Sequence, residues 1–429
     1  MRGPYPPTRI SSIAATSVVA KGAAVRVGLF TREYPPEVYG GAGVHVEYLA
    51  KELAKLVDVT VHCFGAVRPV QPGGPRVVAH GSWPRLDGDD RHLAALRTMS
   101  VDLAMAAAGD GLDVLHSHTW YANFAGHLGK LTYDVPHVVT MHSLEPLRPW
   151  KADQLGGGYA LSSFCERTAI EAADAVIAVS AGMRADILTG YPSVPQERVH
   201  IVYNGIDTEE YRQVPASDVL DRLGIDKDQP YVLFVGRITR QKGLSHLLKA
   251  AAAFNKDAQL VLCAGSPDNP DIGGEVAAQI AALSQQRRGV IWIREMLPRP
   301  DLIALLGHAA VFVCPSVYEP LGIVNLEAMA CETAVVASAV GGIPEVVVDG
   351  ETGLLVPLEL GPDGMTPADE AGFAAALGER VNALLSNADL ARSFGAAGRA
   401  RAKASFSWSA IAAQTAQLYR QVKGETPDT

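Results

Sequence analysis

The chain has 429 residues, of which 48% are hydrophobic and 19% are charged, and its formal net charge is −9. This length exceeds what one core usually holds, so we expect two domains, and the composition excludes a mainly disordered protein. The acidic balance argues against nucleic acid as a partner, because nucleic-acid-binding domains normally carry a basic excess. No apolar run approaches the length of a membrane span, so no membrane partner is expected either.

Residues 1–24 precede the first regular pattern. They hold two arginines and a short apolar run that faintly imitates a signal peptide, and Lys21 interrupts the approach to the first strand. Because the apolar part is short and weak, we interpret residues 1–24 as a disordered leader or as a start codon assigned too early.

The five cysteines are widely spaced, and three of them lie in apolar, strand-like runs. Buried and reduced thiols are the interpretation that we favour over disulfides or metal ligands. Reduced thiols in turn favour a cytoplasmic location.

The segment 25–204 has the pattern of a first α/β domain. A β-rich run from residue 25 is followed by turn residues, a helical pattern over 44–56 and a strand over 59–64. Further strands are expected at 114–117, 137–141, 175–180 and 199–202, with helical segments between them. Alternation of strand and helix predicts a parallel, doubly wound sheet.

A second α/β series occupies residues 205–405, after a polar linker and a short helix within 204–229. Strands are expected at 231–236, 259–265, 290–293, 311–314, 334–338 and 354–356, and an alanine-rich helix over 371–404. Residues 406–429 read as a last helix, which ends near residue 423, and a tail. Two such domains predict a cleft between them, with ligands at the carboxyl ends of the strands.

The stretch 314–333 combines a strand end, a turn and a new helix. Glu319 lies in the turn, and Glu327 follows eight positions later inside the helix. The free N–H groups of Gly322, Ile323 and Val324 would offer an anion site at the helix N-terminus. We interpret this stretch as the donor pocket of a sugar-nucleotide enzyme.

Two other strand-to-helix turns carry candidate phosphate ligands. Arg237 and Lys242 lie in the run G-R-I-T-R-Q-K-G, where two cations can straddle a diphosphate. Gly40 and Gly41 lie in Y-G-G-A-G after the first strand, where backbone can pack against a phosphate or sugar. A solvated basic loop and a plain tight turn are the alternative interpretations of these two turns.

Histidines follow two predicted strands, in H-S-H-T-W and T-M-H-S-L-E-P. That edge of an open α/β sheet is where ligand groups lie, so His142 and His118 are candidate functional residues, with a structural role as the alternative. We expect no metal, because these histidines lack carboxylate or cysteine partners at helical spacing. A serine or cysteine nucleophile finds no support, since G-x-S-x-G is absent.

These segments together resemble the retaining GT4 glycosyltransferases of GT-B fold, and among them the actinobacterial glycogen synthase type. The resemblance extends from residue 25 to about 423 and is carried by T-R-E-Y-P-P-E-V-Y-G-G-A-G-V-H-V, H-S-H-T-W, H-S-L-E-P-L-R-P-W, N-G-I-D, V-G-R-I-T-R-Q-K-G and E-P-L-G-I-V-N-L-E. It implies an α/β protein in which two Rossmann-like domains face each other across a cleft. It also implies that the terminal helix crosses back onto the first, acceptor-side domain.

The resemblance implies a role for each matching position. Glu319 would grip hydroxyls of the transferred sugar, and Glu327 would bind the ribose of the nucleotide. Arg237 and Lys242 would bind the diphosphate and stabilise the leaving charge. The remaining donor contacts would come from the backbone of Gly40 and Gly41, the amides of Leu321, Gly322 and Ile323, His142 near the 6-position of the sugar, and Asn204 beside the hinge.

For this type of enzyme the resemblance implies transfer of glucose from ADP-glucose to glucose 1-phosphate, which gives α-maltose 1-phosphate, or to a growing α-1,4-glucan. No metal cofactor is needed if Arg237 and Lys242 neutralise the diphosphate. An acceptor phosphate would need cations in the first domain, for which Arg148 and Lys151 are candidates, with a surface loop as the alternative. His118 is a candidate on the acceptor side, and a homodimer is expected from the family alone.

One departure from the family pattern and four rival functions remain open. Classical bacterial glycogen synthases carry a lysine before the paired glycines, whereas Val38 and Tyr39 precede them here, which leaves the contacts of this loop open. The rivals are another GT4 hexosyltransferase, a sugar-nucleotide epimerase or PLP-dependent phosphorylase, and a non-catalytic sensor of nucleotide sugars. No motif marks the Schiff-base lysine that the phosphorylase would need.

Overall fold

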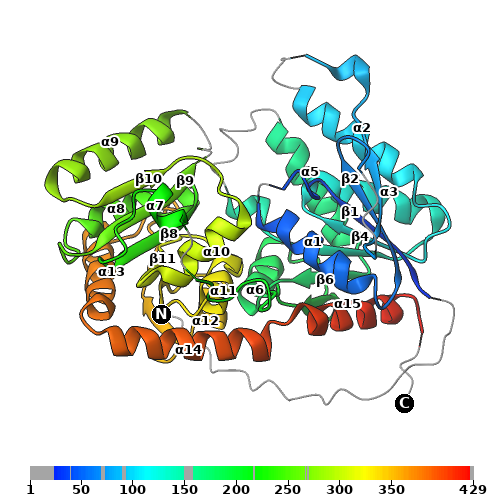
Figure 1. Ribbon diagram of the computed structural model, residues 1–429. Coiled ribbons are helices and arrows are strands. Elements are labelled where there is room, and N and C mark those ends of the chain that lie inside the picture. The colour runs from blue at the N-terminus through cyan, green and yellow to red at the C-terminus, as the bar shows by residue number, and fades with distance from the viewer. Residues whose placement is uncertain are drawn as a thin grey trace.

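The structure is a computed structural model that describes residues 24–38, 40–68, 73–88, 93–148, 158–215, 218–265, 267 and 270–425. The prediction of a disordered leader falls almost wholly outside the described residues. Figure 1 shows two lobes side by side, one built from the first half of the chain and one from the second.

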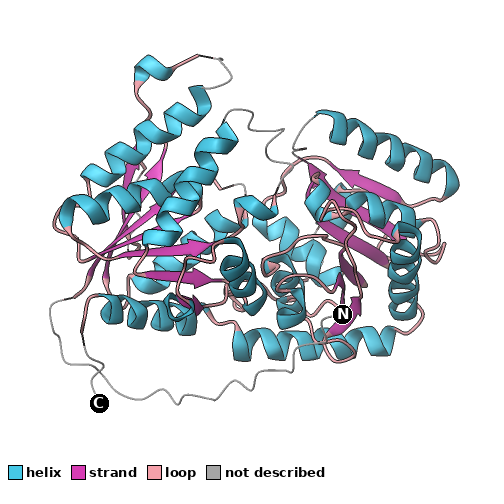
Figure 2. Cartoon of the chain, turned by 180° about the vertical axis from the view of Figure 1, so that it is seen from behind, coloured by secondary structure: helices cyan, strands magenta, loops and turns pink. Residues whose placement is uncertain are grey.

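The first lobe contains a seven-stranded, wholly parallel sheet of order β3-β2-β1-β4-β5-β6-β7. The strands are β1 (Arg26–Thr31), β2 (Asp58–Phe64), β3 (Arg76–His80), β4 (Val114–His118), β5 (His137–Met141), β6 (Ala175–Ala178) and β7 (Val199–Ile201). The helices are α1 (Gly41–Leu53), α2 (Leu93–Ala107), α3 (Trp120–Tyr133), α5 (Gly158–Ala172) and α6 (Ala181–Gly190), with short 3-10 turns η1 (Pro84–Leu86), η2 (Glu145–Leu147) and η3 (Gln196–Arg198). Helices cover both faces of the sheet (Figure 2), so its central strands are buried throughout.

The second lobe contains a six-stranded parallel sheet of order β10-β9-β8-β11-β12-β13. Its strands are β8 (Tyr231–Arg237), β9 (Gln259–Gly265), β10 (Val290–Ile293), β11 (Val311–Cys314), β12 (Val335–Ser338) and β13 (Gly353–Val356). Its helices are α7 (Val219–Arg222), η4 (Arg240–Lys242), α8 (Leu244–Ala251), α9 (Pro270–Gln286), α10 (Arg299–His308), α11 (Ile323–Ala330), α12 (Ile343–Val346), α13 (Glu370–Leu385) and α14 (Ala388–Ser405). Two doubly wound parallel sheets confirm the predicted fold class.

Two expectations about secondary structure were wrong. The single alanine-rich helix expected over 371–404 is the pair α13 and α14. The side chain of Asn387 accepts a hydrogen bond of 3.0 Å from the amide of Leu390 and so starts a new helix. The edge strand β3 was not predicted, because its apolar part, Val77–Ala79, is only three residues long and none of its residues is buried.

The last helix, α15 (Trp408–Val422), packs against α1 of the first lobe, and Figure 1 shows the chain passing from α14 under one lobe to α15 under the other. The chain crosses between the lobes twice, near Ile206 and near Phe406. The two crossings lie side by side, since the amide of Ile206 donates to the carbonyl of Phe406 at 2.8 Å. A Cβ at Gly205 would lie 2.6 Å from the ring of Trp408. Glycine is therefore the residue that allows the two crossings to approach this closely.

All five cysteines are free, four of them buried and Cys263 half-buried, which confirms the expected reduced thiols. Among the described residues, none of the helices has both the length and the apolar character that crossing a bilayer requires.

Candidate functional site

The carboxyl ends of the strands in the two sheets face each other, and the loops that follow them are in contact. In the loop that follows β6, the hydroxyl of Ser180 donates to the carbonyl of Pro320 in the second lobe at 2.6 Å. In the loop that follows β5, the amide of Leu144 donates to the hydroxyl of Tyr318 at 3.3 Å. The loops that follow the strands therefore enclose the predicted ligand region from both lobes.

Lys242 and Glu319 form an ion pair at the heart of this region. The ammonium Nζ lies 2.6 Å from Glu319 Oε2, and the hydroxyl of Ser316 donates to the same oxygen at 3.2 Å. The two loops are tied together by a bond of 2.9 Å from the amide of Val317 to the carbonyl of Gln241. Burial lowers the pKa of Lys242, but the attraction of Glu319 outweighs burial and leaves that pKa raised, so Lys242 carries a full positive charge at neutral pH.

The approach of these loops depends on a glycine. Gly243 has a φ of 66°, and a Cβ there would lie 1.9 Å from the carbonyl oxygen of Pro315. Arg237, the last residue of β8, is half-buried on the same edge and lies near enough to Lys242 to affect its pKa by charge repulsion. The structure thus brings both predicted cations and Glu319 to one edge of the second sheet.

The N-termini of α1 and α11 converge across the cleft. Gly322, at a φ of 94°, is the N-cap of α11, and a Cβ at Gly41, the first residue of α1, would lie 3.7 Å from Ile323 Cδ1. Leu321, which precedes the cap, is buried. Two helix N-termini that meet at one point favour a bound anion, as the paired glycines and the amides of 321–323 predicted.

The amide of Gly40 already has a negatively charged partner. It donates to Glu33 Oε2 at 2.9 Å, and a Cβ at Gly43 would lie 2.7 Å from the same carboxylate oxygen. A phosphate that binds the Gly40 amide must therefore displace the side chain of Glu33. The sequence pattern did not reveal this competition, because Glu33 lies seven residues before the glycine.

Glu327, in the second turn of α11, is buried. Burial raises its pKa to about 7, against the opposing effects of a hydrogen bond to Tyr211 and the charge of Arg299. Tyr211 belongs to the segment that links the two lobes and is itself buried. Glu327 therefore has Tyr211 of the linker as a hydrogen-bond partner and lies near enough to Lys242 for that charge to lower its pKa, so both carboxylates of the predicted donor pocket lie within reach of one cation.

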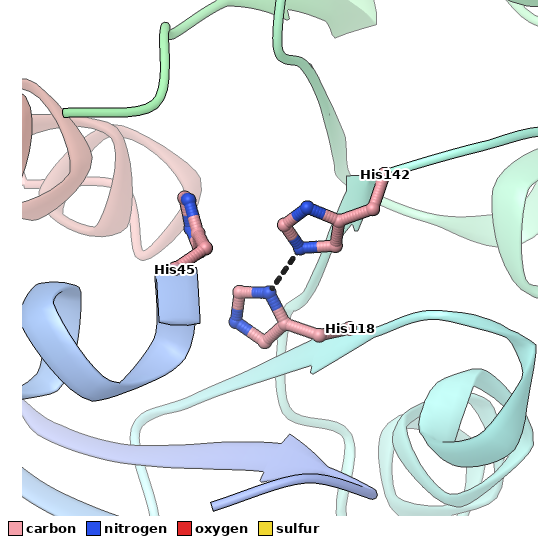
Figure 3. A group of neighbouring side chains, drawn as sticks. All are labelled: His45, His118 and His142. Atoms are coloured by element: carbon pink, nitrogen blue, oxygen red, sulfur yellow. Dashed lines mark hydrogen bonds between the residues drawn. The ribbon is translucent and has the colours of Figure 1, made fainter. Parts of the chain in front are cut away.

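Three histidines of the first lobe form a cluster beside the cleft (Figure 3). His118 Nδ1 at the end of β4 lies 3.1 Å from Nε2 of His142, which follows β5. The ring of His45, on α1, lies with its centroid 4.7 Å from that of His142. Burial lowers the pKa of His45 to about 4 and holds the pKa values of His118 and His142 well below 6.5, so all three rings are neutral at pH 7.

Sequence reasoning missed His45. It lies one helical turn after Gly41, and residues spaced by four share a face of a helix. This spacing was the available signal. Its ring also orients a predicted donor residue, since His45 Nδ1 lies 2.7 Å from Asn204 Oδ1 at the crossing between lobes. Asn204 thus lies beside the histidine cluster.

The two candidate acceptor cations are placed only in part. Arg148 donates from Nη1 to the hydroxyl of Ser143 at 3.1 Å, in the loop that follows His142. Lys151 lies outside the described residues, and so does Tyr39.

An unpredicted carboxylate joins the lobes next to this site. Glu345 accepts hydrogen bonds from the amides of Ala181 at 2.8 Å and Gly182 at 2.9 Å, at the N-terminus of α6. The hydroxyl of Tyr203 donates to the same carboxylate at 3.0 Å. A charge that satisfies two free amides of the opposite domain stabilises the closed arrangement of the cleft.

Comparisons with known proteins agree with this geometry. The model of Glycosyltransferase Family 4 matches residues 39–210, and that of Glycosyl transferases group 1 matches residues 218–366. The chain is 57% identical to the alpha-maltose-1-phosphate synthase of Mycolicibacterium smegmatis over 401 residues, which span 93% of this chain and 100% of the relative. It is 54% identical to the enzyme of the same name from Mycobacterium tuberculosis (strain ATCC 25618 / H37Rv) over 402 residues, 93% of this chain and 100% of the relative.

A solved structure shares the whole architecture. The sucrose-phosphate synthase of Thermosynechococcus elongatus superposes with a TM-score of 0.75 at 28% identity, over 94% of this chain and 100% of that chain. The catalytic domain of Starch Synthase IV from Arabidopsis thaliana, bound to ADP and acarbose, gives a TM-score of 0.68 at 17% identity, over 94% and 100%, and shows the fold alone. The chain therefore belongs to the retaining GT4 glycosyltransferases of GT-B fold and is a hexosyltransferase.

Proposed function

We propose that the protein transfers glucose from ADP-glucose to the 4-hydroxyl of glucose 1-phosphate, with retention, and so makes α-maltose 1-phosphate for α-glucan synthesis. The observation that carries the proposal is the Lys242–Glu319 pair, 2.6 Å apart, at the edge where the N-termini of α1 and α11 meet. The high identity to two alpha-maltose-1-phosphate synthases supports the choice of reaction.

The donor occupies the edge of the second sheet in this proposal. Its diphosphate lies between the two helix N-termini, where Arg237 and Lys242 supply positive charge. Glu319 accepts hydrogen bonds from hydroxyls of the glucose, and Glu327 accepts them from the ribose. Tyr211 and Glu327 are both buried, which supports a nucleotide site from which water is excluded.

The transfer needs no protein nucleophile in this arrangement. The bond between the anomeric carbon and the diphosphate oxygen breaks, and the acceptor 4-hydroxyl forms the new bond on the same face. Its proton passes to the departing diphosphate oxygen, so ADP leaves protonated and atoms and charge balance. Lys242 is held by Glu319 where negative charge grows on that oxygen, which is the electrostatic contribution we assign to it. No metal enters this scheme.

The acceptor binds on the first lobe, beside His118 and His142. The guanidinium of Arg148 is our candidate ligand for the acceptor phosphate, with Lys151 as a second cation.

The location and the assembly of the protein are part of the same proposal. All five thiols are free, which supports a cytoplasmic location. The assembly that we propose is a homodimer.

A product assay tests the proposal. The full-length protein is incubated with ADP-glucose or UDP-glucose and, in separate reactions, with glucose 1-phosphate, maltose or glycogen. We expect ADP release that depends on glucose 1-phosphate. Release with glycogen alone would favour direct elongation of an α-1,4-glucan, and no release of nucleoside diphosphate in any reaction would exclude a transferase of this kind.

A further inference from the structure

The cluster of His45, His118 and His142 has the composition of a metal site as well as of a sugar contact. The three side chains come from three different parts of the fold, and Figure 3 shows the rings of His118 and His142 facing each other with the ring of His45 beside them. One potential ligand nitrogen from each ring can be chosen so that all three lie within 4.8 Å of one another. Neutral imidazole is the most common protein ligand for transition metals.

The nitrogen atoms of His45 already have the arrangement found in metal-binding histidines. Its Nδ1 lies 2.7 Å from Asn204 Oδ1, and an amide oxygen accepts but does not donate, so Nδ1 carries the proton and Nε2 keeps its lone pair. That Nε2 atom is buried and has no hydrogen-bond partner among the described residues. A polar partner that fixes the outer nitrogen orients the inner one toward a metal.

The distances also suit a tetrahedral ion. Bonds of 2.0–2.1 Å place tetrahedral ligand nitrogens roughly 3.3 Å apart. His118 Nδ1 and His142 Nε2 are 3.1 Å apart, close to this spacing, but they share a hydrogen bond. Metal binding replaces that bond: the ring that donates it moves its proton to the other ring nitrogen, and both rings turn so that their lone pairs point at the ion. One nitrogen of His45 lies within 4.8 Å of a nitrogen of each other ring, so a movement of the His45 ring by about 1.5 Å, with rotation of its side chain to aim Nε2, closes the site.

We propose that His45 Nε2, His118 Nδ1 and His142 Nε2 bind a divalent ion of the zinc class, and that the bound ion inhibits the enzyme. Three protein ligands leave a fourth position for water or a substrate oxygen. Inhibition rests on the proposed function, because coordination withdraws His142 Nε2 from the transferred sugar. Binding of the ion does not depend on that function.

Two probes test the site in the full-length protein without any activity assay. We expect Co²⁺ to give the intense visible absorption of a four-coordinate ion, and Zn²⁺ to bind in a 1:1 ratio by calorimetry. The variant His45→Gln is expected to weaken Zn²⁺ binding at least about a hundredfold, beyond the 10–100-fold that loss of an outer-shell partner costs. The weak absorption of six-coordinate cobalt, or wild-type affinity in the variant, would overturn the proposal.

The chain supplies a matched control. His62 Nδ1 and His80 Nε2 lie 3.0 Å apart on β2 and β3, close to the 3.1 Å between His118 and His142, and belong to no three-ligand group among the described residues. The variant His80→Gln is expected to bind Zn²⁺ as the wild type does. If His80→Gln loses binding and His45→Gln keeps it, the assignment is wrong.

A second variant covers the case in which His45→Gln fails to fold. Asn204→Ala leaves all three ligands in place, and we expect a 10–100-fold loss of Zn²⁺ affinity. For inhibition, the rate of ADP release with Zn²⁺ is compared with the metal-free rate of the same protein, and a chelator is expected to restore it. Unchanged or increased rates would overturn inhibition. Absence of turnover with and without metal would count against the proposed function and leave the binding test intact.

Discussion

Lys242 is the residue whose replacement tests the donor site most sharply. Its side chain is 24% exposed, and its ammonium faces Glu319 across 2.6 Å in a largely enclosed site. Loss of one preorganised charge from such a site costs about 10²–10³-fold in turnover, or ~2.7–4 kcal/mol. We therefore expect Lys242→Ala to lower kcat for ADP release by about a hundredfold or more.

Folding must be separated from this loss. Lys242→Ala leaves the Glu319 carboxylate with the hydroxyl of Ser316 as a hydrogen-bond donor, and this change costs at most about 3 kcal/mol because the pair is partly solvated. The matched control is Lys249→Ala on α8, where an exposed lysine pairs with Glu370 outside the cleft. The control should retain full turnover. Wild-type turnover in a folded Lys242→Ala protein would refute the assignment of Lys242 to the leaving group.

The other predictions concern pH and the closed cleft. Burial raises the pKa of Glu327 to about 7. In the proposed function its ionised form accepts hydrogen bonds from the ribose, so the KM for ADP-glucose should rise by up to about tenfold per pH unit below 7. Glu327→Gln should remove this pH dependence, as a pH series of KM would reveal. A Cβ at Gly182 would lie 2.8 Å from the carbonyl of Gly341 in the other lobe, so Gly182→Ala should lower kcat/KM at least about tenfold with little change in Tm. Gly205→Ala, whose Cβ would lie 2.6 Å from Trp408, should instead lower the free energy of unfolding by about 1–3 kcal/mol in urea titration.

Local patterns predicted the strands of the second sheet and their carboxyl ends well. The strands that end at Arg237 and Cys314 are apolar runs bounded by turn residues, and neighbouring parallel strands present their carboxyl ends together. The pairing of Lys242 with Glu319 follows from this topology once both turns are identified. The boundaries of most central strands were predicted within one or two residues for the same reason.

The contacts that the sequence did not predict join distant parts of the chain. Glu345 satisfies amides at the N-terminus of α6, 163 and 164 positions away, and no local pattern marks it as an interdomain residue. The carboxylate of Glu33 accepts a hydrogen bond from the Gly40 amide because the chain folds back after β1. His45 joins His118 and His142 only when α1 packs on the sheet and its ring reaches the residues at the ends of β4 and β5. These contacts depend on tertiary packing, and the four-residue spacing between Gly41 and His45 is the one local signal among them.

The central claim is that this site makes an α-1,4 bond to glucose 1-phosphate with retention. Proton and phosphorus NMR of the product formed from ADP-glucose and glucose 1-phosphate measures the linkage, the anomeric configuration and the phosphate position at once. We predict one α-1,4-linked disaccharide that keeps its 1-phosphate, formed in equal amount to ADP. A β-linked product, a product without phosphate, or ADP released without a disaccharide would contradict the account.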